Sequence, residues 1–407
     1  MSYERDPGTA LVAVEEKKLP VAQKSAYWGR VASCYTVLWR ILLIALLLFA
    51  ALFMLLFSRA FTYDSVFCFF KDLQAVSAFV PSDYDAVYTT YEEGEHVSLS
   101  YRGGVAFVNG GGVEVYSPDG KRLLDVDLEL KNPRAVASRK YLVAFENGGT
   151  HFSVTNSYAE LYRGETEFPI YGAEISDSGH FALITASDEV LSQVLLYDNN
   201  FNLIQRFRRA SATVGVSLTE NGKRIALLGA GAEEGAVHGQ LDVFELGESE
   251  AELTQHFREE FPLAVDFTGN RNLMVLTDRT LRCLNTEGKV HAELAADGKT
   301  VAYTANENGA LLVLETDGIT ATNRVIVWNK KGSTLYDSAF TGDITAVALG
   351  KKECFLLSGE RAVHIDADSD TQTELPVSAG ATDLYIVDDG AVRVVYPAKT
   401  EYYAFKN

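Results

Sequence analysis

Two patterns of hydrophobic and polar residues divide this chain. Near the N-terminus, Ile41 to Phe57 form a continuous apolar run without a charge, a glycine or a proline. From about residue 92 onward, short stretches of alternating apolar and polar residues are separated by turn-forming clusters, and no long segment follows the helical period. The first pattern predicts one long apolar helix, and the second predicts a domain built of strands.

The apolar run predicts a transmembrane helix at residues 37–59. At about 1.5 Å per residue, Ile41 to Phe57 extend about 25 Å, and the flanking residues bring the helix to bilayer length. Lys and Arg are more frequent before the run than just after it, so the positive-inside bias places the tail, 1–36, in the cytoplasm and the rest outside. A cleaved signal peptide is the alternative, but the long tail and the long run favour an uncleaved signal-anchor.

One element recurs through the rest of the chain. An apolar strand, a turn rich in Asp, Asn or Gly and a second strand begin near eight positions: Val113, Phe152, Val194, Leu241, Leu281, Val325, Ala362 and Val392. The spacing is about 40 residues, and only strands lie between the copies, which is typical of a β-propeller with four strands per blade. The pattern therefore predicts an all-β propeller ectodomain at residues 92–407, joined to the helix by a stalk or linker at residues 60–91.

Eight copies favour eight blades, and seven blades is the alternative. The last unit is short, with room for about three strands. We therefore expect an early strand such as Val97–Tyr101 to complete it, because a closed ring leaves no unpaired strand edge.

This arrangement resembles WD40-like and quinoprotein-like propellers, and more closely the bacterial membrane proteins that consist of one N-terminal helix and a propeller ectodomain. The Trp-Asp dipeptide of WD40 repeats is absent, and Trp328 is the only tryptophan of the predicted ring. The scarcity of tryptophan also argues against the quinone cofactor of the quinoprotein relatives. The resemblance implies a fold and a location, and we predict no cofactor.

Charge and cysteine content exclude other classes. The formal net charge is −19, so binding to a nucleic-acid backbone, which requires Lys and Arg, is not expected. No two cysteines form a C-x-x-C pair, which leaves zinc and thioredoxin-type sites without their ligands. Buried free thiols are expected, and a disulfide between Cys283 and Cys354 stays open.

Two glycine-containing motifs have the wrong surroundings for phosphate binding. Gly229, Gly231 and Gly235 have the spacing G-x-G-x-x-x-G, and a strand follows them where a dinucleotide site needs a helix. A long flexible loop is therefore expected here. Lys331-Gly332-Ser333 lacks the upstream glycine of a P-loop and is expected to be a hairpin turn.

Three alternating aspartates could present oxygens to a calcium ion. Asp366, Asp368 and Asp370 form D-x-D-x-D, with Glu374 beyond, but Thr371 stands where a calcium loop has glycine. A solvated hairpin tip is the favoured interpretation, and we predict no metal site.

No catalytic constellation stands out. The seven histidines are scattered, with no pair at i and i+4, and no G-x-S-x-G elbow is present. The sequence therefore predicts no catalytic residue and favours a scaffold that docks another protein of the cell envelope, since propellers present recognition loops on a rigid ring. The alternative is a receptor or sensor for a glycan or small ligand in the propeller funnel.

Overall fold

The computed structural model describes residues 26–56, 89–90, 96–117, 122–233 and 235–405. The chain divides into two compact units, Met1–Val66 and Phe67–Asn407.

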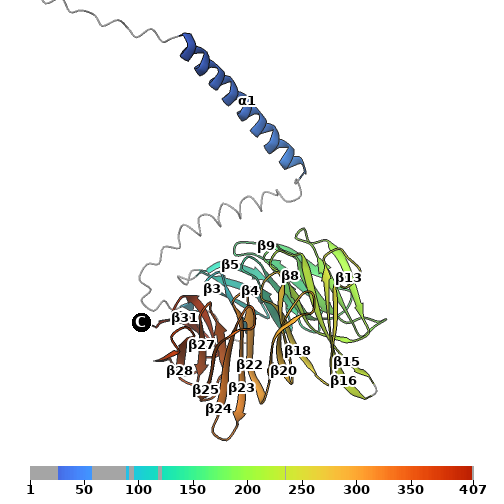
Figure 1. The fold of residues 1–407 in the computed structure, drawn as a ribbon, viewed down its shortest axis with the longest axis vertical. Coiled ribbons are helices and arrows are strands. Elements are labelled where there is room, and N and C mark those ends of the chain that lie inside the picture. The colour runs from blue at the N-terminus through green and yellow to red at the C-terminus, as the bar shows by residue number, and fades with distance from the viewer. Residues whose placement is uncertain (1–25, 57–88, 91–95, 118–121, 234, 406–407) are drawn as a thin grey trace, which may run out of the picture. The chain divides into compact units, whose positions relative to one another are not determined.

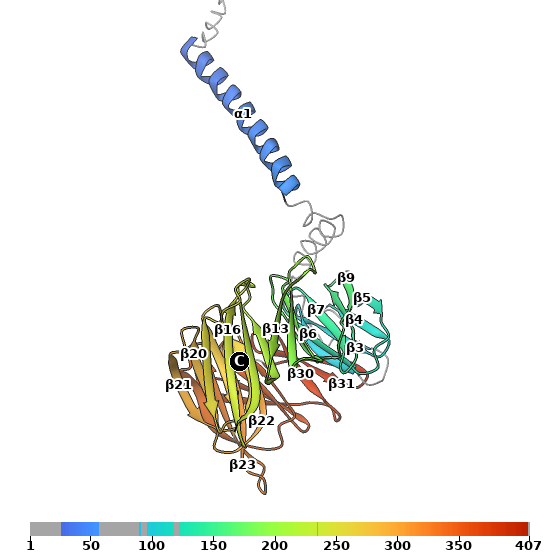
Figure 2. The same cartoon turned by 90° about the vertical axis from the view of Figure 1, so that its right-hand side faces the viewer.

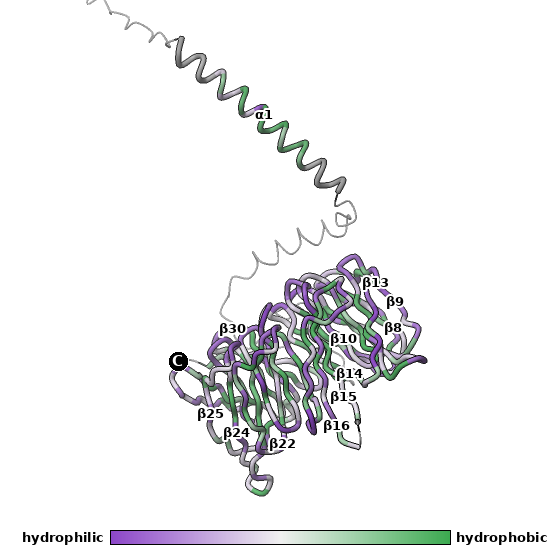
Figure 3. Tube along the Cα trace, turned by 45° about the vertical axis from the view of Figure 1, so that its right-hand side comes forward, coloured by the Kyte–Doolittle hydropathy of each residue, from purple (hydrophilic) through white to green (hydrophobic). Residues whose placement is uncertain are grey.

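The described part of the first unit is one long helix, α1 (Ala26–Leu56). It begins earlier than expected, because no proline interrupts the sequence between Pro20 and Pro81. Figure 3 shows that its described middle part is largely hydrophobic. Over the described residues, no helical segment has the length and hydropathy needed to cross a bilayer. The transmembrane span predicted at 37–59 is thus not supported by the structure.

The second unit is an all-β propeller (Figures 1 and 2). Its described residues form eight four-stranded antiparallel sheets, which confirms the prediction of eight blades. In each blade we name the strands A to D outward from the centre.

The strand bounds follow the chain. Blades 1 to 4 consist of β2 (His96–Tyr101), β3 (Gly104–Asn109), β4 (Gly112–Tyr116), β5 (Arg122–Asp127); β6 (Pro133–Ala137), β7 (Leu142–Glu146), β8 (His151–Thr155), β9 (Glu160–Glu165); β10 (Ile170–Ile175), β11 (Phe181–Thr185), β12 (Ser192–Tyr197), β13 (Leu203–Arg209); and β14 (Ala212–Leu218), β15 (Arg224–Glu233), β16 (Ala236–Glu245), β17 (Leu253–Arg258). Blades 5 to 8 consist of β18 (Pro262–Phe267), β19 (Asn272–Thr277), β20 (Thr280–Asn285), β21 (Val290–Ala295); β22 (Lys299–Asn306), β23 (Gly309–Asp317), β24 (Thr322–Asn329), β25 (Thr334–Thr341); β26 (Ala346–Leu349), β27 (Glu353–Ser358), β28 (Arg361–Asp366), β29 (Thr371–Pro376); and β30 (Asp383–Asp388), β31 (Ala391–Tyr396), β32 (Lys399–Ala404), β1 (Thr89–Thr90).

The recurring hairpin of the sequence is the C–D pair of the first seven blades. In the last blade, however, Val392 lies in β31, which is strand B. This difference explains why the final copy follows its predecessor after a shorter interval.

The B and C strands are the most buried, as in β11 and β12, whereas the outer strand β17 alternates between exposed and less exposed residues.

The ring is closed by a strand other than the expected one. The outermost strand of blade 8 is β1, where Thr89 pairs with Thr400 and Thr90 with Lys399. The segment Val97–Tyr101 instead belongs to β2, the innermost strand of blade 1, so the expectation that it completes the last blade is wrong. Blade 8 then packs on blade 1, where the Tyr385 hydroxyl donates to Ser98 Oγ at 2.8 Å.

Most of the core lies between neighbouring blades. One cluster joins blades 4 and 5 through residues such as Leu228 and Val265, and another joins blades 7 and 8 through Phe355 and Val394. Because every blade depends on both neighbours for burial, the eight blades form a single folding unit.

The two ends of the channel differ in the connections that surround them. The end that we call the AB face carries the A–B and C–D turns, because the A strands run toward it. The opposite end, the BC face, carries the B–C hairpins and the connections from one blade to the next. Figures 1 and 3 show the β15–β16 and β23–β24 hairpins projecting on the same side.

Candidate functional site

The glycine motif at residues 229–235 lies in a hairpin. Strands β15 and β16 continue through it, with Gly231 opposite His238 and Glu233 opposite Ala236. The expected long loop is therefore wrong: the two strands keep pairing through a small-residue stretch that has no strand periodicity in sequence. Because no helix follows Gly231, the hairpin offers no helix N-terminus to a dinucleotide.

The aspartates of the D-x-D-x-D motif stabilise a turn. Asp366 Oδ1 accepts the backbone N–H of Asp368 at 2.8 Å, and Asp368 is ion-paired with Lys352. Glu374 is paired with Arg361 at 3.0 Å. The segment joins β28 to β29 as the expected hairpin, and no group of three or more potential metal ligands occurs among the described residues.

The other candidates have structural roles. Lys331-Gly332-Ser333 forms the β24–β25 turn, where Gly332 has a φ of 79° and a side chain would collide with Cys283. Cys283 and Cys354 are free and buried, so the disulfide between them is excluded; burial raises the pKa of the Cys283 thiol to about 11. Cys34 is exposed, and Cys68 lies outside the described residues.

The BC face carries a set of apolar side chains that the sequence did not reveal. Four consecutive A strands, β10, β14, β18 and β22, each contain a β-bulge at their beginning. The bulged residue is apolar and exposed in every case, by 36–60%: Tyr171, Val214, Leu263 and Val301. A bulge turns its residue out of the strand's regular alternation, and bulges are frequent beside functional sites.

Small residues make these bulges feasible. Each bulged residue is followed by glycine or alanine: Gly172, Gly215, Ala264 and Ala302. A side-chain carbon added at Gly172 would lie 3.0 Å from Ile184 Cδ1, and one added at Gly215 would lie 3.4 Å from Val265 Cγ1. An apolar residue followed by Gly or Ala at the start of four successive units is the sequence signal from which the site could have been found.

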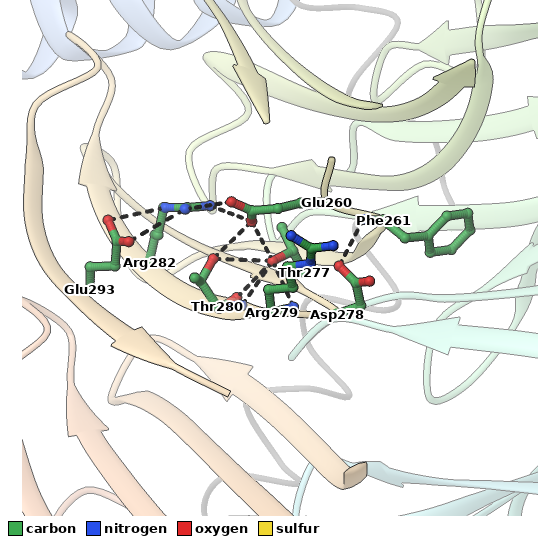
Figure 4. A network of polar contacts seen from close by, with 8 residues as sticks. All are labelled: Glu260, Phe261, Thr277, Asp278, Arg279, Thr280, Arg282 and Glu293. Carbon is green, nitrogen blue, oxygen red and sulfur yellow. Dashed lines mark hydrogen bonds and ion pairs between the residues drawn. The ribbon is translucent and has the colours of Figure 1, made fainter. Parts of the chain in front are cut away.

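Phe261 adds an aromatic ring to this set. It precedes β18, is 43% exposed and is followed by Pro262. Its backbone N–H donates to Asp278 Oδ1 at 2.8 Å, and its carbonyl accepts the N–H of Asp278 at 2.9 Å. Figure 4 shows the ring pointing away from these contacts. We call Tyr171, Val214, Phe261, Leu263 and Val301 the apolar rim.

A polar network fixes the backbone beside Phe261 (Figure 4). Arg282 donates from Nη1 and Nη2 to the two oxygens of Glu260, at 2.7 Å each, and Glu260 also accepts the hydroxyls of Thr277 and Thr280. The bonds from Arg282 hold the pKa of Glu260 at about 2, well below its ordinary value. Glu260 therefore stays ionised and paired, and Phe261 is presented on a rigid support.

The AB face contains a cavity of about 580 Å³ at its end of the channel. Arg139, in the β6–β7 turn, lies at this cavity and contacts carboxylates of three other blades. Its Nε is 2.5 Å from Asp177 Oδ2, its Nη2 is 3.1 Å from Glu220 Oε2, and its Nη1 is 3.8 Å from Glu307 Oε1. Blades 2 and 6, which carry Arg139 and Glu307, are opposite in a ring of eight, so Arg139 extends across the mouth of the channel.

A model of a protein family described as "Family of unknown function (DUF5711)" matches residues 82–402. No protein among those with curated descriptions matches the chain significantly.

Two solved structures are similar to the propeller. BamB from Moraxella catarrhalis has a TM-score of 0.48 at 12% identity, covering 77% of this chain and 99% of BamB. The Pan2 WD40 domain from Neurospora crassa has a TM-score of 0.46 at 11% identity, and the match covers 68% of this chain and 89% of that domain. With TM-scores below 0.5, neither similarity bears on what this chain does.

Proposed function

This chain belongs to the family of unknown function DUF5711, and we propose that it is a membrane-anchored propeller scaffold that docks another envelope protein on its BC face. The observation that carries the proposal is the apolar rim. Four bulges at equivalent positions of consecutive blades each expose an apolar side chain, and Phe261 is held among them.

The chemistry of the rim indicates the kind of partner. Large exposed apolar residues that are grouped together mark interaction surfaces, and aromatic anchors supply much of the binding energy at protein interfaces. The five rim residues carry no charge, and Glu260, which precedes Phe261, is already paired with Arg282 within the blade. A partner is therefore expected to contribute apolar side chains rather than a complementary charge.

The membrane anchor is proposed from the composition of α1. Its described side chains from Val37 to Phe49 are exposed, and the apolar ones among them lie on all sides of the helix. A helix that is apolar all round requires either a protein core or a lipid environment. The apolar sequence continues to Phe57, beyond the described side chains.

The orientation follows from the basic residues before the helix. We propose that the N-terminus is cytoplasmic and that the propeller lies outside the cytoplasmic membrane. Protease added to intact spheroplasts should then degrade the propeller, and full protection of the propeller would contradict the orientation.

The docking proposal is tested by affinity purification of the detergent-solubilised protein followed by mass spectrometry. Leu263→Glu should reduce the recovered partner by about tenfold, because a charge would be buried at the interface. Val290→Glu is the matched control: Val290 is also 38% exposed and lies in the same blade, in β21 away from the rim. Equal recovery with both variants, at unchanged melting temperatures, would refute docking at the rim.

A receptor for a small ligand is the second candidate, and the cavity on the AB face favours it. Its volume falls within the range of small-molecule sites, about 300–1,000 Å³. Both proposed roles are binding functions and require no catalytic residue.

A further inference from the structure

The cavity on the AB face is lined by the ends of A strands from six blades. We call it the channel cavity. A volume of about 580 Å³ is far larger than a divalent cation needs, because such an ion is held by six to eight oxygens at about 2.0–2.6 Å. The size of the channel cavity suits an organic molecule.

The lining has an excess of negative charge. Five carboxylates face two guanidinium groups: Glu174, Asp177, Glu220, Asp266 and Glu307 against Arg102 and Arg139. The charge of Arg139 is shared by three of the carboxylates, those of Asp177, Glu220 and Glu307. Two carboxylates, those of Glu174 and Asp266, remain deeper in the channel.

Neither of these two deeper carboxylates is ion-paired with a described Lys, Arg or His. Asp266 Oδ2 accepts the hydroxyl of Tyr303 at 2.9 Å. Glu174 is partly exposed in the channel cavity and makes no hydrogen bond or ion pair with any described residue. Burial, together with the nearby charge of Asp266, raises the pKa of Glu174 to about 8, and burial raises that of Asp266 to about 6. A partly desolvated carboxylate without a cationic partner is costly in its ionised form, and a bound cation would lower that cost.

We propose that the channel cavity binds a small organic ammonium ion, with its charged nitrogen against Glu174 and Asp266. Apolar lining residues such as Leu218 and Phe267 provide contacts for its carbon chain. Arg139 then acts as a gate, because its guanidinium group occupies the acidic mouth through which the ligand enters.

This proposal couples ligand binding to a proton. Near neutral pH Glu174 is mostly protonated, and an ammonium ion binds to the ionised form. Binding therefore releases a proton from Glu174, and the affinity rises as the pH increases through about 8.

The test is calorimetric titration of the detergent-solubilised full chain with n-butylammonium chloride at pH 7 and pH 9. A pKa of about 8 predicts an affinity about tenfold higher at pH 9 than at pH 7, with proton release at pH 7 that is visible in buffers of different ionisation enthalpy. Glu174→Gln should lower the affinity at pH 9 at least tenfold. The control Glu287→Gln removes the same charge from an exposed turn and should change nothing. Arg139→Ala should speed association, since it opens the mouth.

Three results would overturn the proposal. They are the absence of binding at both pH values, equal effects of Glu174→Gln and Glu287→Gln, and displacement of butylammonium by magnesium chloride at equal ionic strength. The last result would show an inorganic cation site instead. None of these results bears on docking at the apolar rim, which lies at the opposite end of the channel.

Discussion

Arg282 and Glu260 form a two-pronged ion pair in which Nη1 and Nη2 each lie 2.7 Å from one carboxylate oxygen. Both side chains are largely buried, 12% and 13% exposed. The pair anchors the segment that presents Phe261, so the position of this exposed aromatic residue depends on a largely buried interaction.

Replacement of Arg282 by lysine should destabilise the propeller. Lysine cannot donate two parallel bonds to Glu260, and a buried carboxylate that loses a partner costs about 1–3 kcal/mol of unfolding free energy. Urea denaturation followed by circular dichroism measures the loss. Arg208→Lys is the control, because Arg208 pairs with Glu189 at the surface and should cost less than about 0.5 kcal/mol. Equal losses of unfolding free energy in the two variants would show that the buried pair contributes no more to stability than the surface pair.

The ion pair of Glu260 with Arg282 also predicts how the stability of the propeller depends on pH. The folded-state pKa of Glu260 is about 2, below the value of about 4.3 in an unfolded chain. The stabilisation is therefore complete above about pH 4.3 and is lost as the pH falls toward 2. Melting temperatures of the native protein and Glu260→Gln should differ at pH 6, and the difference should shrink as the pH falls toward 2. A difference that does not change with pH would contradict this assignment.

The raised pKa of Glu174 predicts the opposite dependence of stability on pH. Its folded-state pKa of about 8 exceeds the unfolded value, so the folded state holds the proton more tightly. Its contribution to stability is greatest below about pH 4 and is lost as the pH rises through 8. Glu174→Gln should consequently raise the melting temperature at pH 9 by about 2 °C or more, and have little effect at pH 4. An equal shift at both pH values would show that the substitution acts through packing alone.

The repeated fold could be predicted from the sequence because its signal is repeated. Hairpin starts such as Val194 and Leu241 recur at nearly constant spacing, and the first seven copies all correspond to the C–D strand pair of a blade. The final hairpin near Val392 differs from the others because it is a B–C pair. The sequence predicts that an early strand completes this blade, and only the structure shows that the strand is β1.

The closing strand β1 and the apolar rim could not be predicted from the sequence, for physical reasons. A strand of two residues, Thr89–Thr90, is too short to show alternation, and its pairing with Thr400 is not local. Leu263 reads as an ordinary strand residue, because a bulge is visible only once the register with β19 is known. The channel pair of Glu174 and Asp266 comes from different blades, and no local motif joins them.

Closure by β1 can be tested by truncation. Removing residues 1–91 deletes β1 and leaves the edge of β32 without its partner, whereas removing residues 1–81 keeps it. Hydrogen exchange should show loss of protection in β32 and also in blade 1, because blade 8 packs against blade 1 through Tyr385 and Ser98. Full protection of blade 1 in the shorter variant would mean that the ring does not depend on this closure.

The most direct test of the docking scaffold is photocrosslinking in intact cells. A benzophenone amino acid placed at Phe261 should give one discrete crosslinked partner, since the ring of Phe261 is presented on a rigid support at the rim. The same amino acid at Val290, in the outer strand of the same blade, should give none. Crosslinking to the same species from both positions, or from neither, would contradict the proposal that a protein partner docks on the BC face.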